Sequence, residues 1–358
     1  MELSIVTVNF RCWDHLRAAL DGLLPAAQLN DGNWEIIVVD NASGGNELEQ
    51  FRKRYEGVRF LENAGNLGFA SGNNLGARHA AGEYLLFMNP DVVVDPTQVG
   101  TLLRDKKAHP DIALLTAPQL DRRGRLQKSF DQFPDLLTYF RSVRSLMRKL
   151  LPGTNPDPRR RRGEIIHCDW ISGSLLMLSR EDFERLGGWS EDFWMYAEDI
   201  DLCRRAADLG MVRALTPSAQ FTHLHGGASR RDPEVTLVTK SEVMISAHVY
   251  IHNHFNGIHR IANHGIVGLR NLGPLVAGGL ANILTLGRLP GLSLRSRLLG
   301  IMLRHYARVV ATGTWLSGKI FDLTKSYHIA FLVVLGALIL IVILFWFTSP
   351  VGLKRDNP

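Results

Sequence analysis

Short apolar runs alternate with helical patterns along the first third of the chain. These runs, many of them rich in β-branched residues, predict strands at residues 3–8, 34–39, 58–61, 84–88 and 112–116. Helical periodicity predicts helices between several of the strands, at residues 13–24 and 72–81. Strands that alternate with helices in this way are typical of α/β proteins, so we predict a mostly parallel sheet flanked by helices.

Polar side chains follow the predicted strands at the points where the strands end. Because ligands gather at the carboxyl ends of parallel strands, these side chains are candidates for a binding site. Asp40 could accept a hydrogen bond from the N3–H of a uracil or thymine ring, although Asp-Asn-Ala-Ser also suits a capped turn. Asp91 could bind Mg²⁺ or Mn²⁺ together with substrate phosphates, although a turn carboxylate is the simpler interpretation of Asp91 alone. The remaining candidates are Asn9, Asn41, Asn63 and Asn89.

The stretch at residues 63–76 is rich in Asn and Gly, and it includes Asn66. Backbone amides exposed by glycine, next to a helix N-terminus, could lie against a diphosphate or a sugar, although any long turn can have this composition. The turn after the first strand lacks the glycines of a dinucleotide fingerprint, and no segment fits a P-loop.

Three carboxylates, Glu198, Asp199 and Asp201, follow an apolar run near the middle of the chain, Phe193-Trp194-Met195-Tyr196-Ala197. Acidic residues are favoured in the first turn of a helix, and the pattern after Asp199 predicts a helix that ends at Gly210. A solvated helix start does not need the apolar run before it. We therefore weigh a second interpretation, in which a carboxylate at the wall of a pocket acts as a general base.

A run without charges predicts one membrane span near the end of the chain. Residues 329–347 carry no charged side chain and end in Phe345-Trp346-Phe347, which is typical of an interfacial aromatic belt. More Lys and Arg precede this run than follow it, so the positive-inside rule predicts a single-pass protein of the inner or plasma membrane with a cytoplasmic catalytic domain.

The chain is expected to divide into a catalytic domain at residues 1–262, an amphipathic or interfacial helical region at 263–327, the span at 328–348 and a short tail at 349–358. Residues 271–287 are apolar but interrupted by Gly and Pro, which suits a re-entrant or interface-lying segment. Residues 294–310 place apolar side chains along one helical face and Arg along another, which predicts either a membrane-surface helix or packing against the soluble domain.

The amino-acid composition limits the kinds of molecule that the protein is expected to bind. The formal net charge is +6, and Arg159–Arg162 form one basic run, yet no nucleic-acid reading motif accompanies it. Phosphate-bearing substrates or anionic lipids suit this charge better than nucleic acid. The three cysteines, Cys12, Cys168 and Cys203, show no metal-binding spacing and leave an odd number, so neither a disulfide framework nor a zinc ribbon is indicated.

Five motifs resemble those of family 2 glycosyltransferases, in the same order along residues 1–260. They are Val39-Asp40-Asn41-Ala42-Ser43, the stretch at 66–74, Asn89-Pro90-Asp91, Gly187-Gly188-Trp189 and the segment at 196–205. The rhamnosyltransferase-type branch is the most similar part of that family. The resemblance implies the GT-A fold, an inverting reaction and a nucleotide-sugar donor.

The resemblance also implies roles for individual residues. Asp40 matches the residue that contacts the nucleotide base. Asp91 matches the last acid of the DxD-type metal motif. Asp199 matches the catalytic base, and Glu198 lies beside it on the acceptor side. The first acid of the metal motif is replaced by Asn89. Of two neighbouring histidines, His225 is preferred over His223 as a further contact to Mg²⁺ or Mn²⁺. The residues expected to bind the donor also include Asn9, Asn63, Asn66 and Asn89. The residues expected to line the sugar or acceptor pocket are Trp170, Gly173 and Trp194.

The predicted function is metal-dependent, inverting transfer of a hexose from a nucleotide sugar to a hydroxyl group. The resemblance favours L-rhamnose from dTDP-rhamnose, with a saccharide or lipid-linked saccharide as the acceptor in cell-surface polysaccharide synthesis. Two alternatives remain open: a polyprenyl-phosphate sugar synthase, whose acceptor is a lipid phosphate, and a non-catalytic membrane-tethered assembly protein that keeps the fold as a scaffold.

Overall fold

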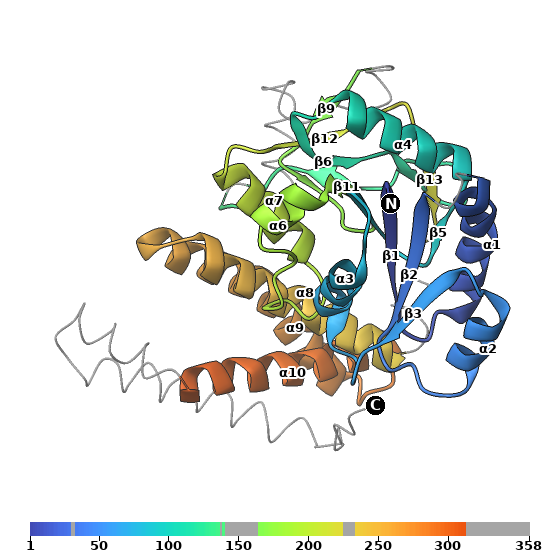
Figure 1. Cartoon of the computed structure of the whole chain (residues 1–358). Coiled ribbons are helices and arrows are strands. Elements are labelled where there is room, and N and C mark those ends of the chain that lie inside the picture. The colour runs from blue at the N-terminus through green and yellow to red at the C-terminus, as the bar shows by residue number, and fades with distance from the viewer. Residues whose placement is uncertain (30–32, 137, 140–163, 225–232, 313–358) are drawn as a thin grey trace. The chain divides into compact units, whose positions relative to one another are not determined.

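A central sheet of eight strands organises the first part of the protein (Figure 1). The structure, a computed structural model, describes residues 1–29, 33–136, 138–139, 164–224 and 233–312. The strand order is β3-β2-β1-β4-β11-β6-β12-β9. The strands are β1 (Leu3–Asn9), β2 (Trp34–Asp40), β3 (Val58–Glu62), β4 (Tyr84–Met88), β6 (Ile112–Thr116), β9 (Ile166–His167), β11 (Leu175–Ser179) and β12 (Val212–Leu215).

The five predicted strands are confirmed, and the first four of them are parallel neighbours. The register places Asn9 opposite Asp40, and Asp40 opposite Glu62. The carboxyl ends of β1, β2 and β3 therefore lie at the same level along one edge of the sheet. The sheet is more mixed than predicted. Strand β11 lies antiparallel between β4 and β6, and β9 is antiparallel to β12.

Helices cover both faces of this sheet because its strands are buried on both sides. Side chains alternate along a strand, so Leu3 and Ile5 join one apolar cluster whereas Val6 joins the other. The first cluster holds residues of α1 (Trp13–Leu29), α2 (Glu47–Arg54) and α4 (Pro96–Ala108). The second holds residues of α3 (Gly68–His79), α6 (Arg180–Arg185) and α7 (Glu198–Asp208).

Two small sheets extend the edge where the parallel strands end. One contains β5 (Val92–Val93), β7 (Gln119–Leu120) and β13 (Phe221–His223), and the other contains β8 (Phe130–Asp131) and β10 (Trp170–Ile171). In the first, β13 is antiparallel to β5 and parallel to β7. This pairing brings His223 beside the segment that follows β4.

The chain divides into two compact units. The first comprises residues 1–231 and 245–263, and the second begins with residues 232–244 and continues from residue 264. The last three helices are α8 (Pro233–His254), α9 (Gly257–Leu284) and α10 (Pro290–Thr312). Helix α9 continues through Gly273 and Pro274, where the sequence predicted an interruption. In α10, Leu298 and Met302 are buried.

Several predicted features lie outside the described residues: the span at 328–348, the tail at 349–358, the basic run Arg159–Arg162 and His225. Among the helices that the structure does describe, none has both the length and the apolar character needed to cross a bilayer.

Candidate active site

The carboxyl ends of β1 and β2 are joined by a buried polar network. The Asn9 side-chain amide donates to Asp40 Oδ1 over 2.8 Å and to Ser43 Oγ over 3.3 Å. The backbone N–H of Ser43 donates to Asp40 Oδ2 over 2.8 Å, which closes the capped turn that the sequence also allowed. Asp40 is only 1 % exposed. Contact of Asp40 with a nucleotide base stays a prediction.

A chain of amide side chains continues from this network to the start of α3. Asn63 donates from its side chain to Asn41 Oδ1 over 2.6 Å, and Asn41 donates to the carbonyl oxygen of Gly68 over 2.9 Å. Asn66 lies beside Trp194, whose indole Nε1–H donates to the Asn66 carbonyl oxygen over 3.0 Å. The Asn-rich stretch is thus fixed to the segment before α7, and the predicted residues Asn63, Asn66 and Trp194 lie close to one another.

Asp91 and His223 form the second cluster of the site. Nε2 of His223 lies 3.0 Å from Asp91 Oδ1, and the backbone N–H of Leu224 donates to the Asp91 carbonyl oxygen over 2.9 Å. Burial alone would raise the pKa of Asp91, but the hydrogen bond and positive charge of His223 outweigh it and hold this pKa below its ordinary value. Asp95 is used differently, because its carboxylate caps α4 by accepting from the backbone N–H of Thr97 over 2.9 Å.

A short hydrogen-bonded path leads from His223 toward α7. Gln119 Oε1 lies 2.9 Å from His223 Nδ1 and accepts from Ser174 Oγ over 2.8 Å. One residue before Ser174, the backbone N–H of Gly173 donates to Asp199 Oδ2 over 3.1 Å. The segment at residues 173–174 therefore connects the Asp91 cluster to the predicted base. Sequence reasoning assigned no role to Gln119.

Helix α7 begins at a strained turn. Tyr196 and Ala197 both have left-handed backbone conformations, with φ of 71° and 65°. Non-glycine residues rarely adopt such values, and they concentrate at functional sites where the surrounding structure holds them in place. The turn places Glu198 inside the protein, at 7 % exposure, and leaves Asp199 partly exposed.

The three acids at the start of α7 have different surroundings. Glu198 is buried, and its Oε2 has no hydrogen-bond partner among the described residues. Burial raises the pKa of Glu198 well above its ordinary value, and the charges of Asp199 and Asp201 raise it further. Burial also raises the pKa of Asp199, although hydrogen bonds from the backbone of Gly173 and Ile200 limit the increase. A carboxyl group with a raised pKa suits the predicted general base.

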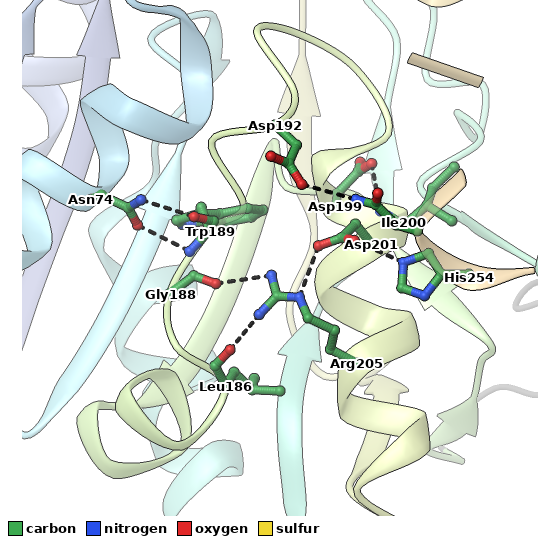
Figure 2. Close-up of polar contacts among 11 residues, drawn as sticks. Asn74, Leu186, Gly188, Trp189, Asp192, Asp199, Ile200, Asp201, Arg205 and His254 are labelled. Carbon is green, nitrogen blue, oxygen red and sulfur yellow. Dashed lines mark hydrogen bonds and ion pairs between the residues drawn. The ribbon is translucent and has the colours of Figure 1, made fainter. Parts of the chain in front are cut away.

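Asp201 has a structural role. It accepts from Arg205 Nε over 2.8 Å, and its other oxygen lies 2.7 Å from His254 Nε2 (Figure 2). Arg205 also donates to the carbonyl oxygens of Leu186 and Gly188, which fixes the turn that carries Gly187-Gly188-Trp189. Arg204 instead donates to Asp208 over 3.2 Å, because its side chain leaves α7 in another direction.

Asn74 holds the same turn from the opposite side. Its side-chain amide donates to the Trp189 carbonyl oxygen over 2.9 Å and accepts from the Trp189 N–H over 3.0 Å (Figure 2). The Trp189 ring lies edge-on to Phe69 and Phe87. Gly173 lies against this ring, since a Cβ atom on Gly173 would fall 3.0 Å from Trp189 Cη2. The glycine therefore allows the backbone that contacts Asp199 to pass close to Trp189.

The other predicted residues lie at the edge of this arrangement. The Asn89 backbone N–H donates to the Ser174 carbonyl oxygen over 2.9 Å, which joins the end of β4 to the segment beside Asp199. Trp170 directs its indole N–H to the Gln132 carbonyl oxygen over 3.0 Å, and Lys128 lies over its ring. Hence Gly173 contacts the predicted base directly, whereas Trp170 contacts β8 and the segment after it.

The protein groups near Asp91 suit a divalent cation that takes most of its ligands from substrate. Within the described ranges, no group of three or more His, Cys, Asp or Glu is arranged to hold a metal ion. Asp91 and His223 offer one carboxylate and one imidazole. Mg²⁺ and Mn²⁺ accept few protein ligands where phosphate oxygens complete the coordination, so this pair fits such a site.

Sequence comparison relates the chain to known transferases. The description "Glycosyl transferase family 2" matches residues 4–186, and "N-terminal domain of galactosyltransferase" matches residues 164–226. N-acetylglucosaminyl-diphospho-decaprenol L-rhamnosyltransferase of Mycobacterium tuberculosis is 28% identical over 247 residues, covering 64% of this chain and 78% of the relative. Rhamnosyltransferase WbbL of Escherichia coli is 26% identical over 230 residues, covering 61% of this chain and 82% of the relative.

Structural comparison shows the same fold in two solved proteins. The mannosyltransferase PcManGT of Pyrobaculum calidifontis, in complex with GDP-Man and Mn²⁺, superposes with a TM-score of 0.50 at 14% identity and covers 97% of this chain and 84% of that protein. GalNAc-T7 with UDP, GalNAc and Mn²⁺ gives a TM-score of 0.50 at 15% identity, over 75% of this chain and 54% of that protein. These likenesses support a GT-A-type α/β fold.

Proposed function

The chain belongs to glycosyl transferase family 2, and from that premise we propose that it is an inverting hexosyltransferase of cell-surface polysaccharide synthesis. The donor in this proposal is a nucleotide sugar, dTDP-L-rhamnose. The acceptor is a hydroxyl group of a saccharide carried on a polyprenyl diphosphate. The names of the mycobacterial and E. coli relatives support this choice of sugar, and the former also supports the lipid-linked acceptor.

One observation carries the proposed chemistry: both carboxylate oxygens of Asp199 are held by backbone N–H groups at the start of α7. Oδ2 accepts from the Gly173 N–H over 3.1 Å, and Oδ1 accepts from the Ile200 N–H over 2.8 Å. These two hydrogen bonds fix the orientation of the carboxylate that would take the substrate proton. Because the pKa of Asp199 is raised, its carboxylate is a stronger base than an ordinary aspartate.

In the proposed reaction, Asp199 takes the proton of the acceptor hydroxyl group while that oxygen attacks the anomeric carbon. The bond from the anomeric carbon to the diphosphate oxygen breaks on the opposite face, and its electron pair leaves with the nucleoside diphosphate. A single displacement of this kind inverts the anomeric centre. A positioned general base contributes about 10²–10⁴-fold to such a reaction.

The leaving diphosphate needs compensating positive charge. Mg²⁺ or Mn²⁺, when bound, would supply it, and Asp91 and His223 are the residues that would hold the ion. Gln119 and Ser174 fix His223 beside Asp91 and join both to the backbone segment that orients Asp199. Asn9, Asp40 and Asn63 line the edge where the nucleotide would lie.

The proposed location is the cytoplasmic face of the inner or plasma membrane, where a polyprenyl-linked acceptor is accessible. The sequence pattern at residues 329–347 and the surrounding positive charges support this location.

A donor screen followed by a transfer assay tests the proposal. Thermal unfolding of the full-length protein is measured with dTDP-rhamnose, GDP-mannose, UDP-N-acetylglucosamine and UDP-galactose, each with and without Mn²⁺. We expect the largest metal-dependent stabilisation with dTDP-rhamnose. Transfer to N-acetylglucosaminyl-diphospho-polyprenol should then give a product whose anomeric configuration is opposite to that of the donor. Transfer to polyprenyl phosphate alone would support a polyprenyl-phosphate sugar synthase instead, and absence of transfer from every donor would contradict both.

A further inference from the structure

The second unit exposes an unusual apolar stripe along α9. Leu269 is 78 % exposed, and Leu280 and Ile283 also face solvent. At about 100° per residue, these three side chains and the half-buried Leu272 and Val276 fall within an arc of about 80°. A solvated helix normally turns its polar side outward, so this helix has its amphipathic pattern inverted.

The stripe continues into the turn that joins α9 to α10. Leu284 and Leu286 are 85 % and 79 % exposed, and Leu289 is also exposed. Exposed leucines that are scattered singly need no explanation, but a contiguous series along one helix and the following turn marks an interaction surface. We call the exposed residues Leu269, Leu280, Ile283, Leu284, Leu286 and Leu289 the α9 stripe.

The apolar side of α10 is not available for the same purpose. Leu298, Leu299 and Met302 are buried. The two helices approach closely where α9 carries Gly278 and Gly279, because a Cβ on Gly278 would meet the Arg295 side chain and one on Gly279 would meet Leu299. Packing of α10 onto α9 therefore leaves the outer side of α9 as the exposed apolar surface.

Charge identifies the occupant of this surface. From residue 257 to residue 312 the sequence contains seven Arg and no Asp or Glu. Arg270 and Arg288 are exposed beside the stripe, whereas Arg297 is paired with Glu234 over 2.6 Å. Exposed leucines bordered by arginines, without any acid, match the boundary between acyl chains and anionic headgroups. A second copy of this basic chain would bring like charges together.

We propose that the α9 stripe lies in the headgroup and upper acyl region of a bilayer that contains anionic lipid. This surface extends the proposed membrane location from the sequence pattern near the C-terminus to a specific helix of the second unit. In the proposed function it would hold the second unit at the membrane that carries the lipid-linked acceptor. The sugar donor plays no part in the argument.

Site-directed spin labelling of the full-length protein tests this surface. Cys12 and Cys203 are buried, so replacing the half-buried Cys168 by Ala gives a background suited to single labels. Labels are placed through Leu269→Cys and Leu280→Cys. Leu209→Cys serves as the matched control, because Leu209 is an equally apolar side chain that is 48 % exposed at the end of α7. The proteins are reconstituted into phosphatidylcholine vesicles with about one quarter phosphatidylglycerol.

Collision with oxygen, which concentrates in lipid, and with a water-soluble nickel chelate distinguishes the outcomes. We expect the labels at 269 and 280 to collide with oxygen more than with nickel, by about tenfold relative to the label at 209, and the difference to shrink without phosphatidylglycerol. Strong nickel collision at 269 and 280 would overturn the proposal. Weak collision with both reagents would also overturn it, because protein, either residues 313–358 or a second copy, would then cover the stripe. The readout does not depend on transfer, so the surface and the proposed reaction can fail separately.

Discussion

The imidazole of His223 lies against the carboxylate of Asp91, with 3.0 Å between Nε2 and Oδ1, although 132 residues separate them in the chain. Pairing of β13 with β5 creates this contact, because it places His223 opposite Val92. The contact gives Asp91, which the sequence shows as an isolated acid after a strand, a defined partner at the position where a donor diphosphate would lie.

Asp91→Asn should abolish most of the Mn²⁺-dependent stabilisation by nucleotide. The substitution keeps the side-chain volume but removes the negative charge that a divalent cation requires. Thermal unfolding with dTDP, across a series of Mn²⁺ concentrations, measures this effect. Asp95→Ala is the matched control, because Asp95 caps α4 four residues later. It should lose about 1 kcal/mol of unfolding free energy and keep the metal response. An unchanged metal response in Asp91→Asn would remove Asp91 from the metal site.

Gln119 should control the same metal response although its side chain contacts neither Asp91 nor Asp199 in the hydrogen bonds described. Its Oε1 accepts from Ser174 and faces His223 Nδ1. Gln119→Met keeps the shape and removes the acceptor, so it should weaken Mn²⁺ affinity by about tenfold, as is usual for a residue that orients a metal-ligating histidine. Gln119→Glu keeps an acceptor oxygen and should retain most of the affinity. Mn²⁺ titration followed by electron paramagnetic resonance, with dTDP present, measures both.

Unchanged Mn²⁺ affinity in Gln119→Met would show that Gln119 serves packing alone. The Nε2 of Gln119 is buried and has no partner in the part of the chain that the structure describes. A purely structural glutamine in this position would therefore gain little from the amide group, and Gln119→Met would then be the more stable variant.

Asp199→Asn should reduce the transfer rate by about 10²–10⁴-fold while nucleotide binding stays nearly unchanged. Asparagine keeps one acceptor oxygen and can preserve one of the two backbone hydrogen bonds, from Gly173 or from Ile200, but it cannot take a proton from the acceptor. Single-turnover transfer measures the rate, and thermal unfolding with dTDP and Mn²⁺ measures binding. Asp208→Asn, on the exposed end of the same helix, should leave both unchanged. Parallel loss of rate and binding in Asp199→Asn would contradict a role as general base.

The sequence predicted the elements of the fold because local periodicity determines them. Each of the five predicted strands is a short apolar run, and burial on both faces of the sheet produces such runs. The insertion of β11 between β4 and β6 could not be predicted in the same way. Residues 175–179 are equally apolar, but the direction of a strand depends on the path of the chain and leaves no local pattern.

The acidic residues of the candidate site could be predicted from the sequence because they occur in recognisable motifs. Asp91 and Asp199 could be named from the sequence, whereas Gln119 could not, because its contact with His223 depends on strand pairing across 104 residues. The contact of Arg205, and not of Arg204, with Asp201 could not be predicted for a related reason. The two are adjacent on α7, and only the packing of the turn at residues 186–188 determines which of them reaches Asp201.

The buried carboxyl of Glu198 should make stability depend on pH. Its pKa in the folded protein lies well above 4.5, the ordinary value, so the folded state favours the protonated form. The favourable effect of Glu198 on stability is complete at pH values below its pKa in the unfolded chain. This effect is lost as pH rises through the pKa of Glu198 in the folded protein. Glu198→Gln removes this loss. Above pH 4.5, the variant should therefore unfold at a higher temperature than the parent, by about 3–5 °C for each unit by which burial raises the pKa.

Thermal unfolding from about pH 4 to pH 8 measures this dependence, which should appear as a gap that widens with pH. Glu184→Gln, on the exposed side of α6, is the control and should show no such gap. A constant difference between Glu198→Gln and the parent at every pH would mean that Glu198 has the same proton affinity in the folded and unfolded chain.

Gly173→Ala should lower the transfer rate by more than its loss of unfolding free energy alone would explain. The added Cβ would lie 3.0 Å from Trp189 Cη2 and 3.4 Å from both Asp199 Cβ and Phe69 Cε1. Trp189 cannot move easily, because Asn74 holds its backbone and Phe69 lies 5.4 Å from its ring centre. The backbone at residue 173 must shift instead, and the hydrogen bond to Asp199 shifts with it. We expect a loss of about 1–3 kcal/mol of unfolding free energy and of about 10²-fold in transfer rate.

Gly100→Ala in α4 is the control. A Cβ on Gly100 would have its nearest neighbouring atom at 3.8 Å, so this variant should be neutral or slightly stabilising. Denaturant unfolding and single-turnover transfer on both variants measure the two effects, and full activity in a destabilised Gly173→Ala would show that the contact does not position Asp199.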